Sequence, residues 1–391
     1  MTPPPPLSWL LGDEAAAVLA EIAAAQVTPA LLTSLRKQLG DPRHAAAVVE
    51  LAELRRRGTN KFANAAEMFF TRRGLEQATD EWIARYKARR LDGFTTVVDA
   101  CCGVGGDLVG SAQGVADRIG IDADAAMTAF AQRNAAAYDV NATVTTTMLD
   151  AENLPECDAW HADPDRRPAG RRTTQPDAHE PSLATLAAWR RRTPAAAIKL
   201  APAAQLPGDW QAECELEWIS RGGECRQLVA WAGPLARKPG KRRATKLSGD
   251  GALATFLGAA DERAEIATSI GDWLHDFDPA VLAADLEGSL ANQNQLQQVT
   301  PRVAYFTSDT PAADPLVASF RVVEAMPLSR KRLAGWLAER GVGTLEIKCR
   351  GVDVRPESLR RELKPRGDAA MTLLVFPDQH GKPTVVAANR P

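Results

Sequence analysis

The stretch VVDACCGVGGD, residues 97–107, is the part of the chain from which the fold can be inferred. It opens with apolar residues typical of a buried strand and passes directly into a glycine-rich turn. Gly103, Gly105 and Gly106 have no Cβ, so the turn can be tight and its backbone can approach a ligand closely. Asp99 lies where the strand ends and can face that ligand. A strand followed at once by a glycine turn predicts the first βαβ unit of a doubly wound α/β domain.

The charges around this turn favour one class of ligand. A dinucleotide site follows the pattern G-x-G-x-x-G and holds a pyrophosphate at a helix N-terminus. Here the pattern is D-x-C-C-G-x-G-G-D, with Asp99 before the glycines and Asp107 directly after them. Two carboxylates repel a pyrophosphate and attract the amino and sulfonium groups of S-adenosylmethionine (SAM). We therefore expect this turn, including Cys101, to bind SAM rather than a nicotinamide dinucleotide.

Two further acidic residues follow the next predicted strands. RIGIDAD, residues 118–124, ends its strand at Asp122, about 20 residues after the glycines, where a carboxylate can accept from both ribose hydroxyls. Asp150 follows ATVTTTML, residues 142–149, and could accept from the adenine amino group. Ligands of open α/β sheets bind at the carboxyl ends of the strands. Acids at three successive strand ends therefore predict one pocket.

The next predicted strand, AWHAD at residues 159–163, ends where this fold places the transferred methyl group. Methyltransferases that act on an exocyclic amine often carry D/N/S-P-P-aromatic there, and Asp163 with Pro164 fits half of that pattern. Asp165 replaces the second proline and Arg166 replaces the aromatic residue, so stacking of a base is not expected. We expect these four residues to be the catalytic segment.

The same segment also resembles the DPPR element of the uracil carbon-5 methyltransferases. Those enzymes present a nucleophilic cysteine just after the next strand. That strand with the residues directly after it, AAAIKLAPA at 195–203, contains no cysteine, so covalent pyrimidine chemistry is disfavoured. Arg166 and Arg167 could bind a phosphate or pair with Asp165, and both interpretations stay open.

Patterning divides the chain into four parts. Residues 1–94 carry apolar residues at helical spacing and predict an N-terminal helical module. Residues 95–235 alternate β-branched runs with Ala-rich helices, which predicts the α/β domain with its parallel sheet. Residues 236–318 are a connecting region of helical and irregular structure, with 254–297 expected to be mainly helical. Residues 319–391 predict a small separate α/β domain.

Two of these parts carry finer expectations. In the α/β domain a helix should begin near residue 106, and residues 213–220 and 225–232 should form an antiparallel hairpin. In the C-terminal domain, Lys348 and Arg350 lie two apart on one strand and face the same side. An RNA contact and an ordinary exposed sheet face explain that alternation equally well.

Composition excludes several classes of protein. The 391 residues are too many for one ordinary core, and 25% charged with 45% hydrophobic residues is typical of soluble globular proteins without a membrane span. The start of the chain, MTPPPPLSWLLGDE, lacks the features of a secretory signal. The 6 cysteines form no CxxC pair and the histidines show no ligand spacing, so we expect no metal site and a cytoplasmic location. The oligomeric state is left open.

The net charge of −2 does not mark a strongly basic nucleic-acid protein. Contact with RNA must then depend on local Lys/Arg runs, each of which is more often a solvated face. The runs are Arg166–Arg167 with Arg171–Arg172, Arg190–Arg191–Arg192, RKPGKRRATK at 237–246, and Arg330–Lys331–Arg332.

Taken together, the motifs resemble the class I methyltransferases with a C-terminal THUMP-like domain. The resemblance rests on KFANAAEMFFTRRGLEQAT, VVDACCGVGGD, ADPDRR, EWISRGGE, FDPAVLAADL, VAYFTSD, FRVVEAMPLSRKRL and LEIKCRGVDVRPESLRREL. The catalytic part is also similar, more distantly, to the RNA cap guanine-N2 methyltransferases (trimethylguanosine synthases). This implies a Rossmann-like class I fold, SAM as methyl donor with S-adenosylhomocysteine as product, and an RNA-binding kind of C-terminal domain.

The resemblance also assigns residues. Matching motifs carry cofactor and active-site roles onto Asp99, Gly103, Gly105, Asp122, Asp150 and Asp163, and the segment GLEQAT, residues 74–79 and ending in Thr79, is expected to close over SAM. The favoured function is methylation of RNA on a base amine such as guanine N2. A methyltransferase of small molecules or proteins, and a module that binds SAM or RNA without turnover, are the alternatives.

Overall fold

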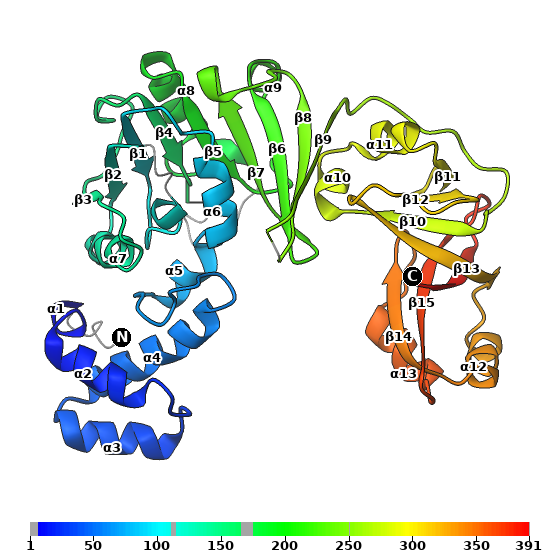
Figure 1. Ribbon diagram of the computed structural model, residues 1–391, viewed down its shortest axis with the longest axis horizontal. Helices are drawn as coiled ribbons and strands as arrows, with labels where there is room; N and C mark the ends of the chain where they lie inside the picture. The colour runs from blue at the N-terminus through cyan, green and yellow to red at the C-terminus, as the bar shows by residue number, and fades with distance from the viewer. Residues whose placement is uncertain (1–6, 111–114, 166–174, 250, 391) are drawn as a thin grey trace. The chain divides into compact units, whose positions relative to one another are not determined.

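The structure is a computed structural model that describes residues 7–110, 115–165, 175–249 and 251–390 (Figure 1). The chain forms two compact units. One comprises Met1–Glu215 with Leu228–Pro239, and the other comprises Leu216–Gln227 with Gly240–Pro391. The expected boundary at residue 94 falls inside the first unit, and the one at residue 318 falls inside the second.

Helices begin the first unit, and side chains cap most of them. Thr28, Asp41, Thr71 and Asp80 each accept a hydrogen bond from a backbone N–H in the first turn of the helix that follows. The helices are α1 (Leu7–Leu10), α2 (Asp13–Ile22), α3 (Pro29–Leu39), α4 (Pro42–Gly58), α5 (Arg72–Gln77) and α6 (Glu81–Ala88).

The core of this helical region continues into the α/β part. Phe62 and Met68, both with no exposed surface, belong to the same hydrophobic cluster as Val104 of the glycine loop and Phe130 of α7 (Ala125–Ala136). The N-terminal helices are therefore built onto the α/β layer and share its hydrophobic core.

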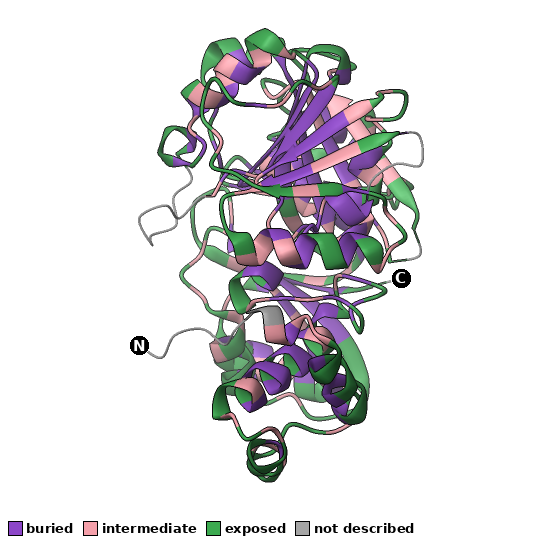
Figure 2. Ribbon diagram, turned by 90° about the vertical axis from the view of Figure 1, so that its left-hand side faces the viewer, coloured by how far each residue is buried: buried purple, intermediate pink, exposed green. Residues whose placement is uncertain are grey.

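A mainly parallel sheet is the centre of the first unit. Six neighbouring strands of the nine-stranded sheet run in the order β3-β2-β1-β4-β5-β7; β7 is antiparallel to β5 and the other pairs are parallel. The strands are β1 (Thr96–Ala100), β2 (Asp117–Asp122), β3 (Thr143–Thr146), β4 (Ala159–Ala162), β5 (Ala196–Leu200) and β7 (Glu224–Ala232). The central strands are buried along nearly their whole length (Figure 2). This order confirms the predicted doubly wound sheet, with the change of winding direction between β1 and β4.

Besides α7, which connects β2 to β3, the described connections of the sheet are short helices and turns. They are η1 (Leu108–Gly110), η2 (Pro176–Ala178), α8 (Leu183–Arg192), α9 (Gly208–Glu213) and η3 (Gly233–Leu235). The helix expected near residue 106 appears within the described residues as the 3-10 turn η1. The predicted hairpin is confirmed: β6 (Glu215–Arg221) meets β7 through Gly222 and Gly223, whose φ values are 64° and 78°.

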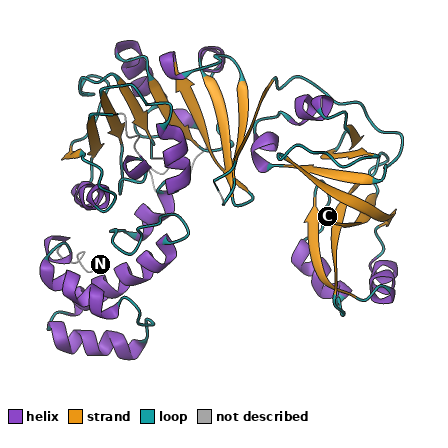
Figure 3. Cartoon of the chain, in the orientation of Figure 1, coloured by secondary structure: helices purple, strands orange, loops and turns teal. Residues whose placement is uncertain are grey.

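The expectation of mainly helical structure over residues 254–297 was wrong. The second unit contains strands there and beside it, with only two short helices (Figure 3). The elements are β8 (Arg242–Leu247), β9 (Leu253–Gly258), β10 (Trp273–Phe277), α10 (Pro279–Ala283), α11 (Glu287–Gln293), β11 (Gln297–Thr300) and β12 (Val303–Ser308). β9 forms hydrogen bonds with β8, and β10 forms them with β13. These pairings make both segments strands, although their local composition favours helix.

The C-terminal region has the alternating strands and helices of the predicted small α/β domain. They are β13 (Val317–Pro327), α12 (Arg330–Glu339), β14 (Val342–Cys349), α13 (Pro356–Leu363), β15 (Ala369–Pro377) and β16 (Pro383–Asn389). The sheet of this region has the order β11-β12-β10-β13-β16-β15-β14, so the supposed connecting region supplies three of its strands. No helix among the described residues is long and apolar enough to cross a membrane.

Candidate functional site

The site lies at the carboxyl ends of β1, β2 and β4, where the winding of the sheet reverses. The glycine loop that follows β1 has an unusual backbone. Cys101 has a φ of 65°, and Gly103 and Gly105 have φ values of 55° and 82°. A side-chain-bearing residue such as Cys101 loses about 1–2 kcal/mol in this left-handed region. The surrounding contacts must hold the loop in this conformation.

The three glycines of the loop have different roles. A Cβ added to Gly103 would meet nothing within 4 Å, so this residue leaves open space above the loop. A Cβ on Gly105 would lie 3.2 Å from the Cα of Ala131, and one on Gly106 would lie 3.0 Å from the backbone nitrogen of Thr79. Gly103 is thus the glycine that can admit a ligand, while Gly105 and Gly106 allow neighbouring elements to approach.

Asp122 fixes the loop to the end of β2. One carboxylate oxygen accepts from the N–H of Gly103 at 2.9 Å and the other accepts from the N–H of Asp124 at 2.9 Å. The side chain is half-buried, and burial raises its pKa above the usual range although these hydrogen bonds oppose the shift. The remaining lone pairs of the carboxylate are available to a hydroxyl-bearing ligand.

Asp150 is exposed and shapes the turn after β3. Its Oδ1 accepts from the N–H groups of Glu152 and Asn153 at 2.8 and 3.1 Å, and its carbonyl accepts from the indole of Trp189 at 2.7 Å. The turn is therefore held at both the main chain and the side chain of Asp150. Met148, which precedes it, is 63% exposed.

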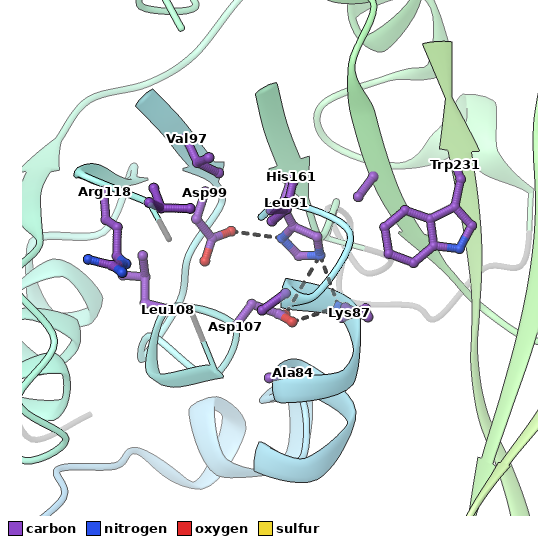
Figure 4. A pocket seen from close by; sticks show the side chains of 13 residues that line it. Ala84, Lys87, Leu91, Val97, Asp99, Asp107, Leu108, Arg118, His161 and Trp231 are labelled. Atoms are coloured by element: carbon purple, nitrogen blue, oxygen red, sulfur yellow. Dashed lines mark hydrogen bonds and ion pairs between the residues drawn. The ribbon is translucent and has the colours of Figure 1, made fainter. Parts of the chain in front are cut away.

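Asp99 and Asp107 belong to a buried network beneath the loop (Figure 4). Oδ1 of Asp99 lies 2.9 Å from Nδ1 of His161, its partner in the β1/β4 ladder. Nε2 of His161 lies 3.1 Å from Nζ of Lys87 on α6, and that ammonium lies 2.6 Å from Oδ1 of Asp107. Thr79 donates its hydroxyl to Oδ2 of Asp107 at 2.7 Å. Residues from α6, β1, β4 and the loop thus meet in one chain of contacts.

The two carboxylates of this network respond differently to burial. Desolvation raises the pKa of Asp99 above its usual range, despite the contact with His161. Desolvation acts on Asp107 in the same sense, but Lys87, His161 and Lys199 outweigh it and pull the pKa of Asp107 below its usual range. Asp107 is therefore the firmly ionised partner of Lys87.

A small, partly open cavity of about 40 Å³ adjoins the network. Its walls include Lys87, Asp99, Asp107 and His161 on one side and the indole of Trp231 on the other. Such a volume holds roughly two or three water molecules and is too small for a nucleoside.

Asp163 follows β4 and is held by a lysine from the neighbouring strand. Nζ of Lys199 on β5 lies 2.5 Å from Oδ2 of Asp163 and 3.2 Å from the carbonyl of Gln77. Lys199 has 9% of its side chain exposed, whereas Asp163 has 25% exposed. The lysine therefore acts from inside the protein on a carboxylate that reaches the surface. Pro164, the next residue, is buried.

Asp165 connects this segment to α5. Its carboxylate accepts from Arg73 at 2.6 Å and from the amide of Gln77 at 3.3 Å. Its backbone forms an isolated bridge with Glu180. The pairing of Asp165 with Arg166 cannot be assessed, because Arg166, Arg167, Arg171 and Arg172 lie outside the described residues. Among the described residues, Arg73 forms an ion pair with Asp165.

The segment ahead of the sheet, residues 74–79, contacts β5, the residues after β4, and the end of the glycine loop. Gln77 contacts Lys199 and Asp165, and Thr79 contacts Asp107. Lys61 holds the end of α5 by donating to the carbonyls of Leu75, Glu76 and Ala78 at 2.8 to 3.0 Å. The segment is therefore fixed against the strand ends, and Thr79 itself is 4% exposed.

Sequence reasoning missed Lys87, His161 and Lys199. His161 and Lys199 each occur in an otherwise apolar strand, AWHA and AAIKL. A basic residue within a buried strand needs a partner, so these two could have been suspected from the pattern. Lys87 carries no such signal, because a lysine near the end of a helix is common.

Cations in several of the basic runs form ion pairs or hydrogen bonds with other residues of the protein. Arg190 pairs with Glu213 at 2.8 Å, Arg192 donates to two main-chain carbonyls, and Arg242 pairs with Asp285 at 2.7 Å. In the second unit, Lys348 and Arg350 lie 2.8 and 2.7 Å from the carboxylate of Asp276. Their alternation is thus explained by an ion-pair cluster on the sheet. Exposed cations remain at Arg191, Arg237, Lys238, Lys241, Lys331 and Arg332.

Within the described ranges, no group of three or more His, Cys, Asp or Glu residues is arranged to hold a metal ion. The site is made instead of carboxylates, main-chain N–H groups and two buried lysines.

Comparisons with known proteins identify relatives for both units. Residues 94–176 match the family described as RNA cap guanine-N2 methyltransferase, and residues 317–390 match the family described as THUMP domain-like. An uncharacterized S-adenosylmethionine-dependent methyltransferase of Mycobacterium tuberculosis H37Rv is 31% identical over 351 residues, which cover 87% of this chain and 94% of that protein. Its counterpart in strain CDC 1551 matches equally well.

A solved structure extends the likeness to the whole fold. The crystal structure of a "putative methyltransferase" from Porphyromonas gingivalis W83 has a TM-score of 0.79 and 22% identity, and covers 97% of this chain and 99% of that one. At this identity the likeness concerns the fold, which is shared over both units.

Proposed function

We propose that this chain, which belongs to the S-adenosylmethionine-dependent methyltransferases, transfers the methyl group to an exocyclic amine of an RNA base, with guanine N2 as the favoured acceptor. One observation carries the proposal. The partly exposed carboxylate of Asp163 stands at the end of β4, at the change of winding direction, and a buried lysine fixes its orientation. A carboxylate held in this way can accept a hydrogen bond from an attacking amine.

The residues of the loop fit SAM. The open space above Gly103 can take the methionine part of SAM. The hydrogen bond from the N–H of Gly103 to the carboxylate of Asp122 fixes the main chain there. We assign the ribose hydroxyls to Asp122 and the adenine amino group to Asp150, whose exposed side chain lies after the next strand. Asp99, Asp107, Thr79 and Gly106 are buried or close-packed, so their part in binding is to support the loop.

The chemistry needs no acid to activate the methyl donor. Bound SAM supplies a methyl group that its sulfonium already activates. Asp163 accepts from the amine and aligns its nitrogen with the methyl carbon, so proximity and orientation provide most of the rate. When the new N–C bond forms and the S–C bond breaks, Asp163 takes the proton that the nitrogen loses. Pro164 and the Asp165–Arg73 ion pair hold this segment in place.

Three features support RNA as the substrate. The catalytic part matches the RNA cap guanine-N2 methyltransferase family, and the C-terminal part matches a THUMP domain-like family. In addition, Arg237, Lys238 and Lys241 are exposed cations in one short stretch, which suits contact with phosphates.

The test uses RNA from a strain that lacks this protein. Purified enzyme and labelled SAM should methylate this RNA but not RNA from the parent strain, and nucleoside mass spectrometry should find one modification restored. Binding should weaken steeply with salt, because each phosphate contact releases counterions. Normal SAM binding without transfer to either RNA would refute the proposal and direct the search to small molecules or proteins.

A further inference from the structure

Both ends of the glycine loop are tied to the same buried side chains. Asp99 precedes the loop and contacts His161, while Asp107 ends it and contacts Lys87. Lys87 and His161 contact each other at 3.1 Å, so they bridge the two carboxylates (Figure 4). The bridge draws its two basic residues from α6 and β4, neither of which belongs to the loop. We call Asp99, His161, Lys87 and Asp107 the bridge.

Proton positions in the bridge follow from its donors. An ammonium group can only donate, so Nε2 of His161 accepts from Lys87. The proton of His161 is then on Nδ1 and donates to Asp99. The hydrogen bonds of the bridge therefore all run one way: Lys87 donates to His161, and His161 donates to Asp99. Lys87 also donates to Asp107. Each of its contacts is removed from solvent, because Lys87, Asp99 and His161 are at most 5% exposed.

Between the two ends lies the unfavourable residue of the loop. Cys101 has a φ of 65°, which a residue with a Cβ adopts only when its surroundings impose it. The hydrogen bond from Gly103 to Asp122 fixes the middle of the loop, and the bridge fixes its two ends. If the ends were released, the loop could relax toward a conformation in which Cys101 is unstrained.

We propose that Lys87 and His161 are positioning residues for the SAM-binding loop: they hold its two ends together so that the strained conformation of Cys101 is the populated one. The inference rests on SAM binding, which belongs to the proposed function, but it does not depend on RNA as the methyl acceptor. Its test therefore measures SAM binding directly.

A matched control is present near the same helix. Arg90, just after α6, forms an ion pair of 2.6 Å with Glu215, and their side chains are 5% and 0% exposed. This pair is as buried as the bridge, and its contacts are with residues outside the glycine loop: Arg90 lies over the ring of Trp231 and donates to the carbonyl of Leu235. Arg90→Met therefore measures what the loss of a buried cation does to stability alone.

The experiment compares Lys87→Met, Arg90→Met, Cys101→Gly and the double variant Lys87→Met/Cys101→Gly by calorimetry with SAM and with S-adenosylhomocysteine. If the loop is competent in one Lys87→Met molecule of ten, its Kd for both ligands rises roughly ten-fold. At saturating SAM its turnover number should stay within about two-fold, because the bound loop is the same. Arg90→Met should lower the denaturation midpoint and leave both Kd values unchanged.

Cys101→Gly gives the decisive result, because glycine adopts this φ without strain. The double variant should recover most of the affinity that Lys87→Met loses. Unchanged affinity in Lys87→Met, or no recovery in the double variant, would overturn the proposal. If Lys87→Met does not fold, Thr79→Val removes only the hydroxyl on Asp107, and a rise in Kd of about five-fold that Cys101→Gly suppresses would support it. An unchanged Kd in Thr79→Val would overturn it.

Discussion

Lys199 of β5 holds Asp163 at the end of β4 through a 2.5 Å contact, although 36 residues separate the two in sequence. The same ammonium group reaches the carbonyl of Gln77 at 3.2 Å, so it also fixes the segment ahead of the sheet. A buried cation thus sets the direction of a carboxylate that is open to solvent.

Asp163→Asn should reduce methyl transfer by roughly 10²–10³, the range lost when one positioned polar group is removed from an active site. SAM affinity should change by less than about two-fold, since we assign Asp163 to the acceptor. Single-turnover transfer and calorimetry measure the two quantities. Asp158→Asn is the control: Asp158 lies at the other end of the same strand, where it accepts from the N–H groups of Thr95 and Thr96, and its loss should affect stability alone.

Lys199→Met should lower the turnover number roughly ten-fold or more, because Asp163 loses the contact that orients it. The effect should vanish when Asp163 is already absent. In a double-mutant cycle, Lys199→Met/Asp163→Asn should therefore be no slower than Asp163→Asn, with a coupling energy of about 1 kcal/mol or more. Additive losses would mean that Lys199 acts independently of Asp163.

Asp122→Ala should weaken SAM binding roughly ten- to a hundred-fold, because it removes the acceptor for the ribose and releases the N–H of Gly103. Burial raises the pKa of Asp122, so in the unaltered protein the affinity should fall as the pH is lowered through that raised pKa. Calorimetry at several pH values measures both effects. Asp124→Ala, which removes the N-cap of α7 but keeps Asp122, should retain most of the affinity.

His275 should make the second unit sensitive to mild acid. Its side chain lies between the hydroxyls of Ser319 and Ser308, and burial lowers its pKa from 6.5 to about 4. Between these two values the unfolded chain binds a proton that the folded chain does not, so the free energy of unfolding falls as the pH falls. The loss is about 3 kcal/mol at most.

Denaturant unfolding between pH 7 and pH 4 tests this dependence. His275→Gln should remove most of the decline between about pH 6.5 and 4, whereas His380→Gln, at an exposed turn, should leave it in place. Equal declines in all three proteins would show that other groups cause the acid sensitivity.

The sequence alone determined the local parts of this protein. The apolar strand before the glycines, the acids at three strand ends and the α/β character of residues 319–391 all rest on patterns of nearby residues, so they could be predicted before any contact was known. The composition of residues 254–297 led to a wrong prediction of helix, because contacts between distant residues determine the structure there. Strand pairing with partners far along the chain decides that region, and local composition does not encode such partners.

Tertiary structure alone decided which acids are open to a ligand. In the sequence Asp99, Asp107, Asp122 and Asp163 look alike. The register of β1 with β4 places His161 against Asp99, and the packing of α6 places Lys87 against Asp107, so Asp99 is buried and Asp107 keeps only 13% of its side chain exposed. Asp122 and Asp163 keep part of their surface exposed. Burial and pairing are properties of the assembled sheet, because the residues that cause them lie far apart in the chain.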